Sequence, residues 1–188
     1  HWRRLINGSA GVCDDKHCRI KVVDNSVDHN YKSKGSNTWG RLVVVGGGYG
    51  GLGAAISAAR MGAKVALIQN RNVLGGNGSS EIRVWAKGNY PPSEYPLDQI
   101  IREFEDQAKA SPAPAEEFAD DKKDKVVKAE KNITLFLGHH AYGLDMAGGK
   151  IASVKAVDVD AGKIKRIRGN FFADCTGHGF IGMWSGAD

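Results

Sequence analysis

The chain has 188 residues, of which 41% are hydrophobic and 25% charged, and this is the composition of an ordinary globular protein. It is long enough to bury a sizeable core without disulfides, and no apolar run approaches the roughly 18 residues of a membrane span. The net charge of +5 arises from Lys and Arg residues that are mixed with acids, so no basic stripe indicates a nucleic-acid partner. We expect a soluble protein of the cytoplasm or periplasm, with no membrane or nucleic-acid partner.

Residues 1–40 are polar and rich in turn-forming residues, apart from one strand-like stretch at Arg19–Asp24. We interpret them as an N-terminal extension or as the tail of an upstream domain. Cys13 and Cys18 lie on either side of His17, but no second pair of Cys or His residues follows at zinc-site spacing. We therefore predict no metal site.

Residues 41–69 have the pattern of a strand, a helix and a second strand. Leu42–Val45 is a continuous apolar run, which is typical of a strand buried on both faces of a parallel sheet. Leu52–Met61 is rich in alanine and predicts a helix, which Gly62 ends in the left-handed conformation that favours glycine. Lys64–Ile68 predicts the second strand, and the three elements together have the length of a βαβ unit.

The rest of the chain also alternates between helical and extended patterns. Apolar residues at helical spacing predict a helix over Leu97–Ala110, which the two prolines of Ser111–Pro114 end. The elements expected after it are a helix over Ala115–Lys131, a strand over Ile133–Leu137, a meander of short strands over 141–172, a returning strand from Phe171, and the start of a helix within Phe180–Ala187. The predicted fold is α/β, a Rossmann-like parallel sheet with a three-stranded antiparallel β-meander as a crossover.

The six residues that directly follow the first strand, Gly46–Gly51, fit the G-x-G-x-x-G pattern of a dinucleotide-binding loop. Gly46 permits the tight turn, Gly48 lets the backbone approach a pyrophosphate, and Gly51 allows the helix to pack closely on the strand. The helix N-terminus near Tyr49 and Gly50 presents N–H groups to the phosphates. The glycine loop has a strand before it, a helix after it and the second strand at the expected distance. This context makes the motif specific for a dinucleotide.

The second strand ends at a position where an acidic residue usually binds the ribose hydroxyls. Gln69 stands there, and its amide is able to accept and donate a hydrogen bond but lacks the charge. Arg71 is a candidate partner for phosphate or adenine, with a surface cation as the alternative, and Asn70 between the two belongs to the same predicted site.

A second glycine-rich loop, residues 74–80, follows closely. Its backbone N–H groups and hydroxyls carry little bulk, and an NAD-binding domain has no need of such a loop here, whereas a flavin nucleotide has. A plain surface loop is the alternative. The candidate binding residues in this loop are Gly75, Gly76, Asn77, Ser79 and Ser80.

The sequence resembles a family of FAD-dependent oxidoreductases that have a glutathione-reductase-like FAD domain, many of which occur in bacteria that degrade polysaccharides. The resemblance rests on the triple glycine after Val43–Val45, the helix end Ala59–Gly62, the second loop with the following Glu81–Arg83, and the closing Ala173–Gly179. It covers residues 41–188 and implies that they form the N-terminal portion of an FAD-binding domain that is incomplete at its C-terminus.

The resemblance also implies roles for individual residues. The first glycine loop would hold the pyrophosphate, Gln69 and Arg71 would lie at the adenosine ribose, and Gly76 and Asn77 with Ser79 or Ser80 would face the phosphate and ribityl side. His140 and Ala141 would meet the adenine edge through their backbone, and the returning strand would close the site with Asp174, Thr176 and Gly177. The sequence departs from the family pattern in Gln69 and in His178, which stands where Asp is usual and is otherwise an exposed turn residue.

The expected function is the nucleotide-binding part of an enzyme that transfers a hydride from an organic, carbohydrate-derived substrate to the flavin. Its partner would be a C-terminal substrate domain of the parent chain, so we expect the fragment alone to be inactive and to bind FAD weakly or not at all. No catalytic residue is assigned. The alternatives are a tRNA-modifying flavoprotein, an NAD-linked dehydrogenase domain and a non-catalytic nucleotide-binding module.

Overall fold

The computed structural model describes residues 41–86 and 96–187. The interpretation of residues 1–40, with the strand at Arg19–Asp24 and the cysteines Cys13 and Cys18, lies outside the described residues.

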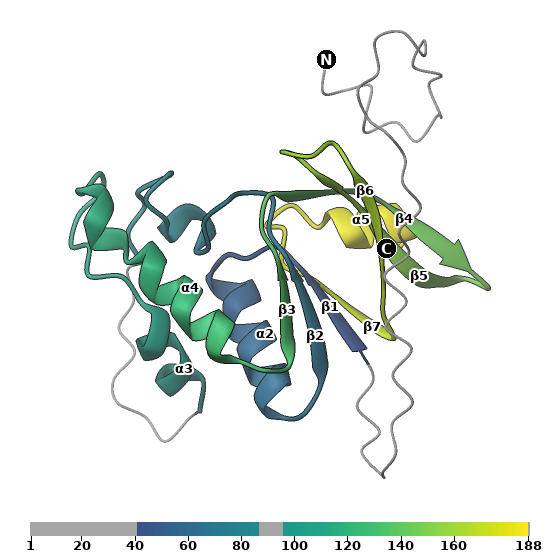
Figure 1. Cartoon of the computed structure of the whole chain (residues 1–188), viewed down its shortest axis with the longest axis horizontal. Coiled ribbons are helices and arrows are strands. Elements are labelled where there is room, and N and C mark those ends of the chain that lie inside the picture. The colour runs from purple at the N-terminus through teal and green to yellow at the C-terminus, as the bar shows by residue number, and fades with distance from the viewer. Residues whose placement is uncertain (1–40, 87–95, 188) are drawn as a thin grey trace, which may run out of the picture.

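Four strands form a parallel sheet that contains the predicted βαβ unit (Figure 1). In spatial order these strands are β3 (Ile133–Phe136), β2 (Lys64–Ile68), β1 (Arg41–Val45) and β7 (Phe171–Asp174). Val44 packs into the core on one face of the sheet, whereas Val43 and Val45 pack into the core on the other face. The apolar run of β1 is therefore buried on both sides, as its sequence predicts.

The predicted meander forms a separate antiparallel sheet of three strands, β4 (His139–Ala147), β5 (Lys150–Asp158) and β6 (Ile164–Arg168). Gly148 and Gly149 join β4 to β5, both with positive φ, which is the geometry of a two-residue hairpin turn. Figure 1 shows this sheet on one side of the parallel sheet and the helices α2, α3 and α4 on the other. The α/β class with a β-meander crossover is thus confirmed.

The helix of the βαβ unit, α2 (Tyr49–Arg60), begins three residues earlier than its alanine-rich stretch predicts. It starts directly after Gly48, so the glycine loop leads into its first turn without a spacer. Leu52, Ile56 and Ala59 lie in the core, and Gly62 ends the helix with φ +94°. This arrangement puts the helix N-terminus at the carboxyl end of β1, where a phosphate would bind.

The region of residues 97–131 differs from its prediction in two places. The first helix, α3 (Pro96–Phe104), stops six residues early because the N–H groups of Asp106 and Gln107 donate to the Tyr49 hydroxyl and to the carbonyl of Glu117. The second is divided at Ala119 into the short 3-10 helix η2 (Ala115–Phe118) and α4 (Asp120–Ala129).

The last helix, α5 (Phe180–Ser185), forms inside the stretch predicted to begin a helix. Within the two described ranges, no helix is both long and apolar enough to cross a membrane.

Candidate functional site

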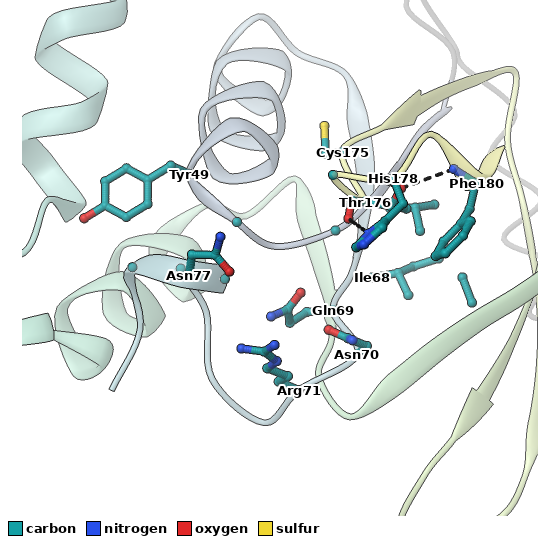
Figure 2. A pocket seen from close by; sticks show the side chains of 18 of the residues that line it. Tyr49, Ile68, Gln69, Asn70, Arg71, Asn77, Cys175, Thr176, His178 and Phe180 are labelled. Carbon is teal, nitrogen blue, oxygen red and sulfur yellow. Dashed lines mark hydrogen bonds between the residues drawn. The ribbon is translucent and has the colours of Figure 1, made fainter. Parts of the chain in front are cut away.

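A cavity of about 520 Å³ lies at the carboxyl ends of β1, β2 and β7 (Figure 2). Ligands of open α/β sheets bind in this crevice beyond the strand ends. Most of the predicted site residues line it, namely Gly46, Gly48, Tyr49, Gln69, Asn70, Arg71, Gly75, Gly76, Asn77, His140, Ala141, Thr176 and Gly177. The chain thus brings together four segments that are far apart in sequence, although contact of these residues with a ligand stays a prediction.

The two glycine loops pack against each other along one wall of the cavity. The N–H of Gly75 donates to the carbonyl of Gly47 over 2.8 Å, and Gly48 and Gly75 form an isolated parallel bridge. A Cβ on Gly76 would come within 3.1 Å of the Gly48 Cα, so a side chain there would force the loops apart. The second loop, with the short 3-10 helix η1 (Gly76–Gly78), is therefore packed into the wall of the cavity, and its contact with a nucleotide stays a prediction.

Each glycine of the first loop meets a different surrounding. A Cβ on Gly46, whose φ is +106°, would lie 2.1 Å from the carbonyl oxygen of Cys175, and one on Gly51 would lie 1.8 Å from the carbonyl oxygen of Gly46. A Cβ on Gly48 would meet only the Gly76 Cα, at 4.0 Å. Gly46 and Gly51 are therefore needed for the fold, whereas the bare backbone of Gly48 leaves open space on the cavity side for a phosphate.

Gln69 lines the cavity but is only 3% exposed. Its Oε1 accepts a hydrogen bond from the N–H of Gly47 over 2.8 Å, and its Nε2 donates to the carbonyl of Val73 over 3.0 Å. The side chain thus connects the first glycine loop to the segment that leads into the second.

Arg71 lies on the cavity wall with part of its guanidinium unsatisfied. Its Nε is 3.6 Å from a carboxylate oxygen of Glu81, and its buried Nη1 has no hydrogen-bond partner among the described residues. A buried donor without a partner costs free energy, which a ligand oxygen would recover. Together with the open space at Gly48, this orphaned donor fits a nucleotide that carries phosphate and hydroxyl oxygens.

Some predicted residues lie outside the cavity lining or have their polar group directed away from it. The Tyr49 hydroxyl donates to Asp106 over 2.6 Å, away from the cavity, although Tyr49 itself lines it (Figure 2). The Ser79 hydroxyl donates to the carbonyl of Gly76, and that of Ser80 to the carboxylate of Asp120. The cavity lining does not include these two serines, nor Gly50 and Gly51.

The returning strand β7 ends in a turn that its own carboxylate organises. Asp174 accepts hydrogen bonds from the N–H and hydroxyl of Thr176 on one oxygen, and from the N–H groups of Ile181 and Gly182 on the other. Burial would raise the pKa of Asp174, but these hydrogen bonds outweigh it and lower the pKa. Asp174 lies outside the cavity lining and positions Thr176, which lies within it.

The segment that follows this turn carries an aromatic stack that the sequence motifs do not indicate. The rings of His178 and Phe180 lie 5.1 Å apart at 7°, and Trp184 stacks on Phe180 at 5.4 Å (His178 and Phe180 in Figure 2). The departure from the family pattern at His178 thus puts an imidazole face at the cavity. Cys175 is a second lining residue that motif reading missed, and burial raises the pKa of its thiol.

The start of the meander closes the cavity beside the end of β2. Burial lowers the pKa of His140, so its imidazole is neutral at neutral pH and suits an uncharged base. Its neighbour His139 is 7% exposed and also lines the cavity, with Nδ1 2.6 Å from the carbonyl oxygen of Leu137 and Nε2 2.8 Å from Nζ of Lys165. The family resemblance implies a role for His140 alone, and no local sequence pattern points to His139.

Among the residues that the structure describes, no group of three or more His, Cys, Asp or Glu side chains is arranged to hold a metal ion.

The parallel sheet, the paired glycine loops and the meander define an α/β dinucleotide-binding domain. Residues 41–188 match the family model described as FAD dependent oxidoreductase, so the chain belongs to this family and its cofactor is FAD. The comparison with curated proteins gives no match.

Two examples illustrate the likeness of the fold to solved structures. Thermovibrio ammonificans THI4 is 22% identical with a TM-score of 0.52, over 79% of this chain and 63% of that one. The E. coli quinol fumarate reductase is 14% identical with a TM-score of 0.52, over 73% of this chain and 32% of that one. The chain therefore spans less than two thirds of either protein that it matches.

Proposed function

We propose that this chain is the nucleotide-holding part of a flavoenzyme that oxidises an organic substrate. The observation that carries the proposal is the contact between the two glycine loops, which leaves the backbone of Gly48 and Gly76 bare at the cavity next to the N-terminus of α2. Such a wall accepts a pyrophosphate through backbone N–H groups and the helix dipole.

The other walls suit the remaining parts of the nucleotide. The pyrophosphate would lie across Gly46–Gly48, the ribose beside the end of β2, and the adenine edge against His140 and Ala141, which line the cavity on the meander side. Bound FAD supplies the two-electron redox chemistry, whereas the protein binds and orients it and excludes water.

The substrate and the partner domain belong to the proposal as well. A carbohydrate-derived substrate would lose a hydride to the flavin and a proton to the solvent, and a two-electron acceptor would then reoxidise the flavin. The partner would be a substrate domain of the parent chain, as the family resemblance implies. Support for this part comes from the family, whose flavin chemistry is oxidoreduction.

The test is the visible absorption of the full-length protein after purification and removal of free FAD. We expect flavin bands, and anaerobic addition of the oxidisable sugar should bleach them, as dithionite does. The matched control is Gly48→Val, which has room for its Cβ and should keep the fold but lose the bands. A native protein that retains no flavin after incubation with FAD would contradict the proposal. Bleaching by dithionite and by a non-carbohydrate alcohol or amine, but by no sugar, would contradict the carbohydrate class alone.

A further inference from the structure

Gln69 occupies the position at which the ribose-binding acid of a dinucleotide fold usually stands, but its polar atoms are already in use. Both ends of the amide are bonded within the protein, to the N–H of Gly47 and to the carbonyl of Val73. Gln69 is only 3% exposed, and both ends of its amide are already hydrogen-bonded. It therefore has few further hydrogen bonds to offer to a ligand.

Turning Gln69 toward a ribose would undo this arrangement. The N–H of Gly47 would lose its acceptor and the carbonyl of Val73 its donor, in a buried place where an unsatisfied polar group is costly. Space is also short, since a Cβ on Gly47 would come within 3.0 Å of the Gln69 Cβ and 2.9 Å of Leu74 Cδ2. The side chain therefore fills a closely packed connection between the two glycine loops.

The next two residues have the polar groups that Gln69 lacks. Asn70 is exposed at the cavity, and its side chain forms no hydrogen bond with another described residue. Arg71 has the unpartnered Nη1 and only a long contact with Glu81. Figure 2 shows these side chains next to Gln69 at the end of β2.

The backbone of the same segment is held firmly. The N–H of Gln69 donates to the carbonyl of Phe136, the N–H of His139 to the carbonyl of Gln69, and the N–H of Gly138 to the carbonyl of Arg71, over 2.9 to 3.0 Å. Asn70 and Arg71 thus project from a fixed main chain, which is what precise recognition of a small ligand needs.

We propose that recognition of the adenosine ribose lies with Asn70 and Arg71, and that Gln69 is a positioning residue that holds the glycine loop in place. The proposal rests on the proposed function, because it concerns the same cavity. Asn70 accepts from or donates to a ribose hydroxyl, and the Arg71 guanidinium turns slightly so that its unpartnered N–H meets an oxygen of the same sugar.

The test compares ADP with 2′-deoxy-ADP and 3′-deoxy-ADP as competitors of FAD, for the full-length native protein and for variants of it. Loss of one hydrogen bond should weaken binding of one deoxy analogue to the native protein by about five- to tenfold. The double variant Asn70→Ala/Arg71→Ala should lose this preference for ADP over the deoxy analogue and bind the two about equally tightly, because no partner for the hydroxyl is left. Gln69→Ala should weaken ADP and its deoxy analogues equally, so the preference should persist.

Thermal unfolding without nucleotide gives an independent readout. Gln69→Ala should lower Tm, whereas Asn70→Ala/Arg71→Ala should leave it nearly unchanged. Gln69→Glu should also lower Tm and should not increase the preference for ADP, because its carboxylate would face the carbonyl of Val73.

Three results would overturn the inference: a hydroxyl preference that persists in the double variant, one that disappears in Gln69→Ala, or a stable Gln69→Glu with an increased preference. Failure of the native protein to bind either FAD or ADP would instead contradict the proposed function, and the ribose assignment with it. In that case the positioning role of Gln69 is decided by Tm alone.

Discussion

Tyr49 and Asp106 are joined by two hydrogen bonds that run in opposite directions. The phenol donates to the carboxylate over 2.6 Å and accepts from the Asp106 N–H over 3.0 Å. Because Tyr49 is the first residue of α2 and Asp106 follows α3, these bonds connect the N-terminus of α2, the proposed phosphate-binding end, to the end of α3. The ring also packs edge-on against Phe104, with centroids 5.3 Å apart.

Tyr49→Phe should therefore lower stability without changing nucleotide binding. It removes both hydrogen bonds but keeps the ring, and we expect a loss of about 2 kcal/mol in the free energy of unfolding in urea. Tyr142→Phe is the matched control, because the half-buried Tyr142 hydroxyl has no hydrogen bond to a described residue. Weakened FAD binding with unchanged stability would mean that the Tyr49 hydroxyl acts on the ligand instead.

Two adjacent glycines of α2 should respond to alanine in opposite ways. A Cβ on Gly51 would lie 1.8 Å from the carbonyl oxygen of Gly46, whereas one on Gly50 would meet nothing within 4 Å. We expect Gly51→Ala to cost about 3 kcal/mol or to prevent folding, since backbone must move. Gly50→Ala should be neutral or stabilising by up to about 1 kcal/mol, because alanine favours the helix. Equal Tm values for the two variants would contradict the packing described for this loop.

Lys123 of α4 is fully buried, and burial lowers its pKa below the ordinary lysine value. The unfolded chain then binds this proton more tightly than the folded one, so the contribution of Lys123 to stability rises as the pH rises toward about 10.4. In Lys123→Met this part of the rise should disappear, whereas the exposed Lys125→Met should retain it. Urea unfolding at a series of pH values measures the effect. An unchanged slope in Lys123→Met would show that another group causes it.

The elements that the sequence predicted well are those with a strong local cause. The apolar run of β1 and the glycine pair at residues 148–149 determine their structures through short-range patterns. The early end of α3 depends on Tyr49, which is more than fifty residues away, and no local pattern contains that contact. The break at Ala119 likewise accompanies the burial of Phe118 and Lys123, whose Nζ donates to the Phe118 carbonyl.

The candidate site shows the same division. The glycine-rich loops predicted that Gly46, Gly48 and the second loop line one cavity. Glycine at these positions directly indicates a backbone that has to turn tightly or approach a ligand closely. The residue type does not indicate the hydrogen-bond partners of a polar side chain. Gln69 is a plausible ribose ligand by position, and only the structure shows its amide bonded to Gly47 and Val73.

The most direct test of where the cofactor binds is a titration of the 15N-labelled full-length protein with FAD, after removal of its flavin, followed by amide chemical shifts, which detect even weak binding. We expect the largest shifts at Gly46, Gly48, Asn70 and Gly76, the residues around the proposed pyrophosphate and ribose positions. In Gly48→Val these shifts should be absent while Tm stays unchanged. No shift at millimolar FAD, or shifts confined to the far ends of the strands, would contradict the placement of the cofactor between the two glycine loops.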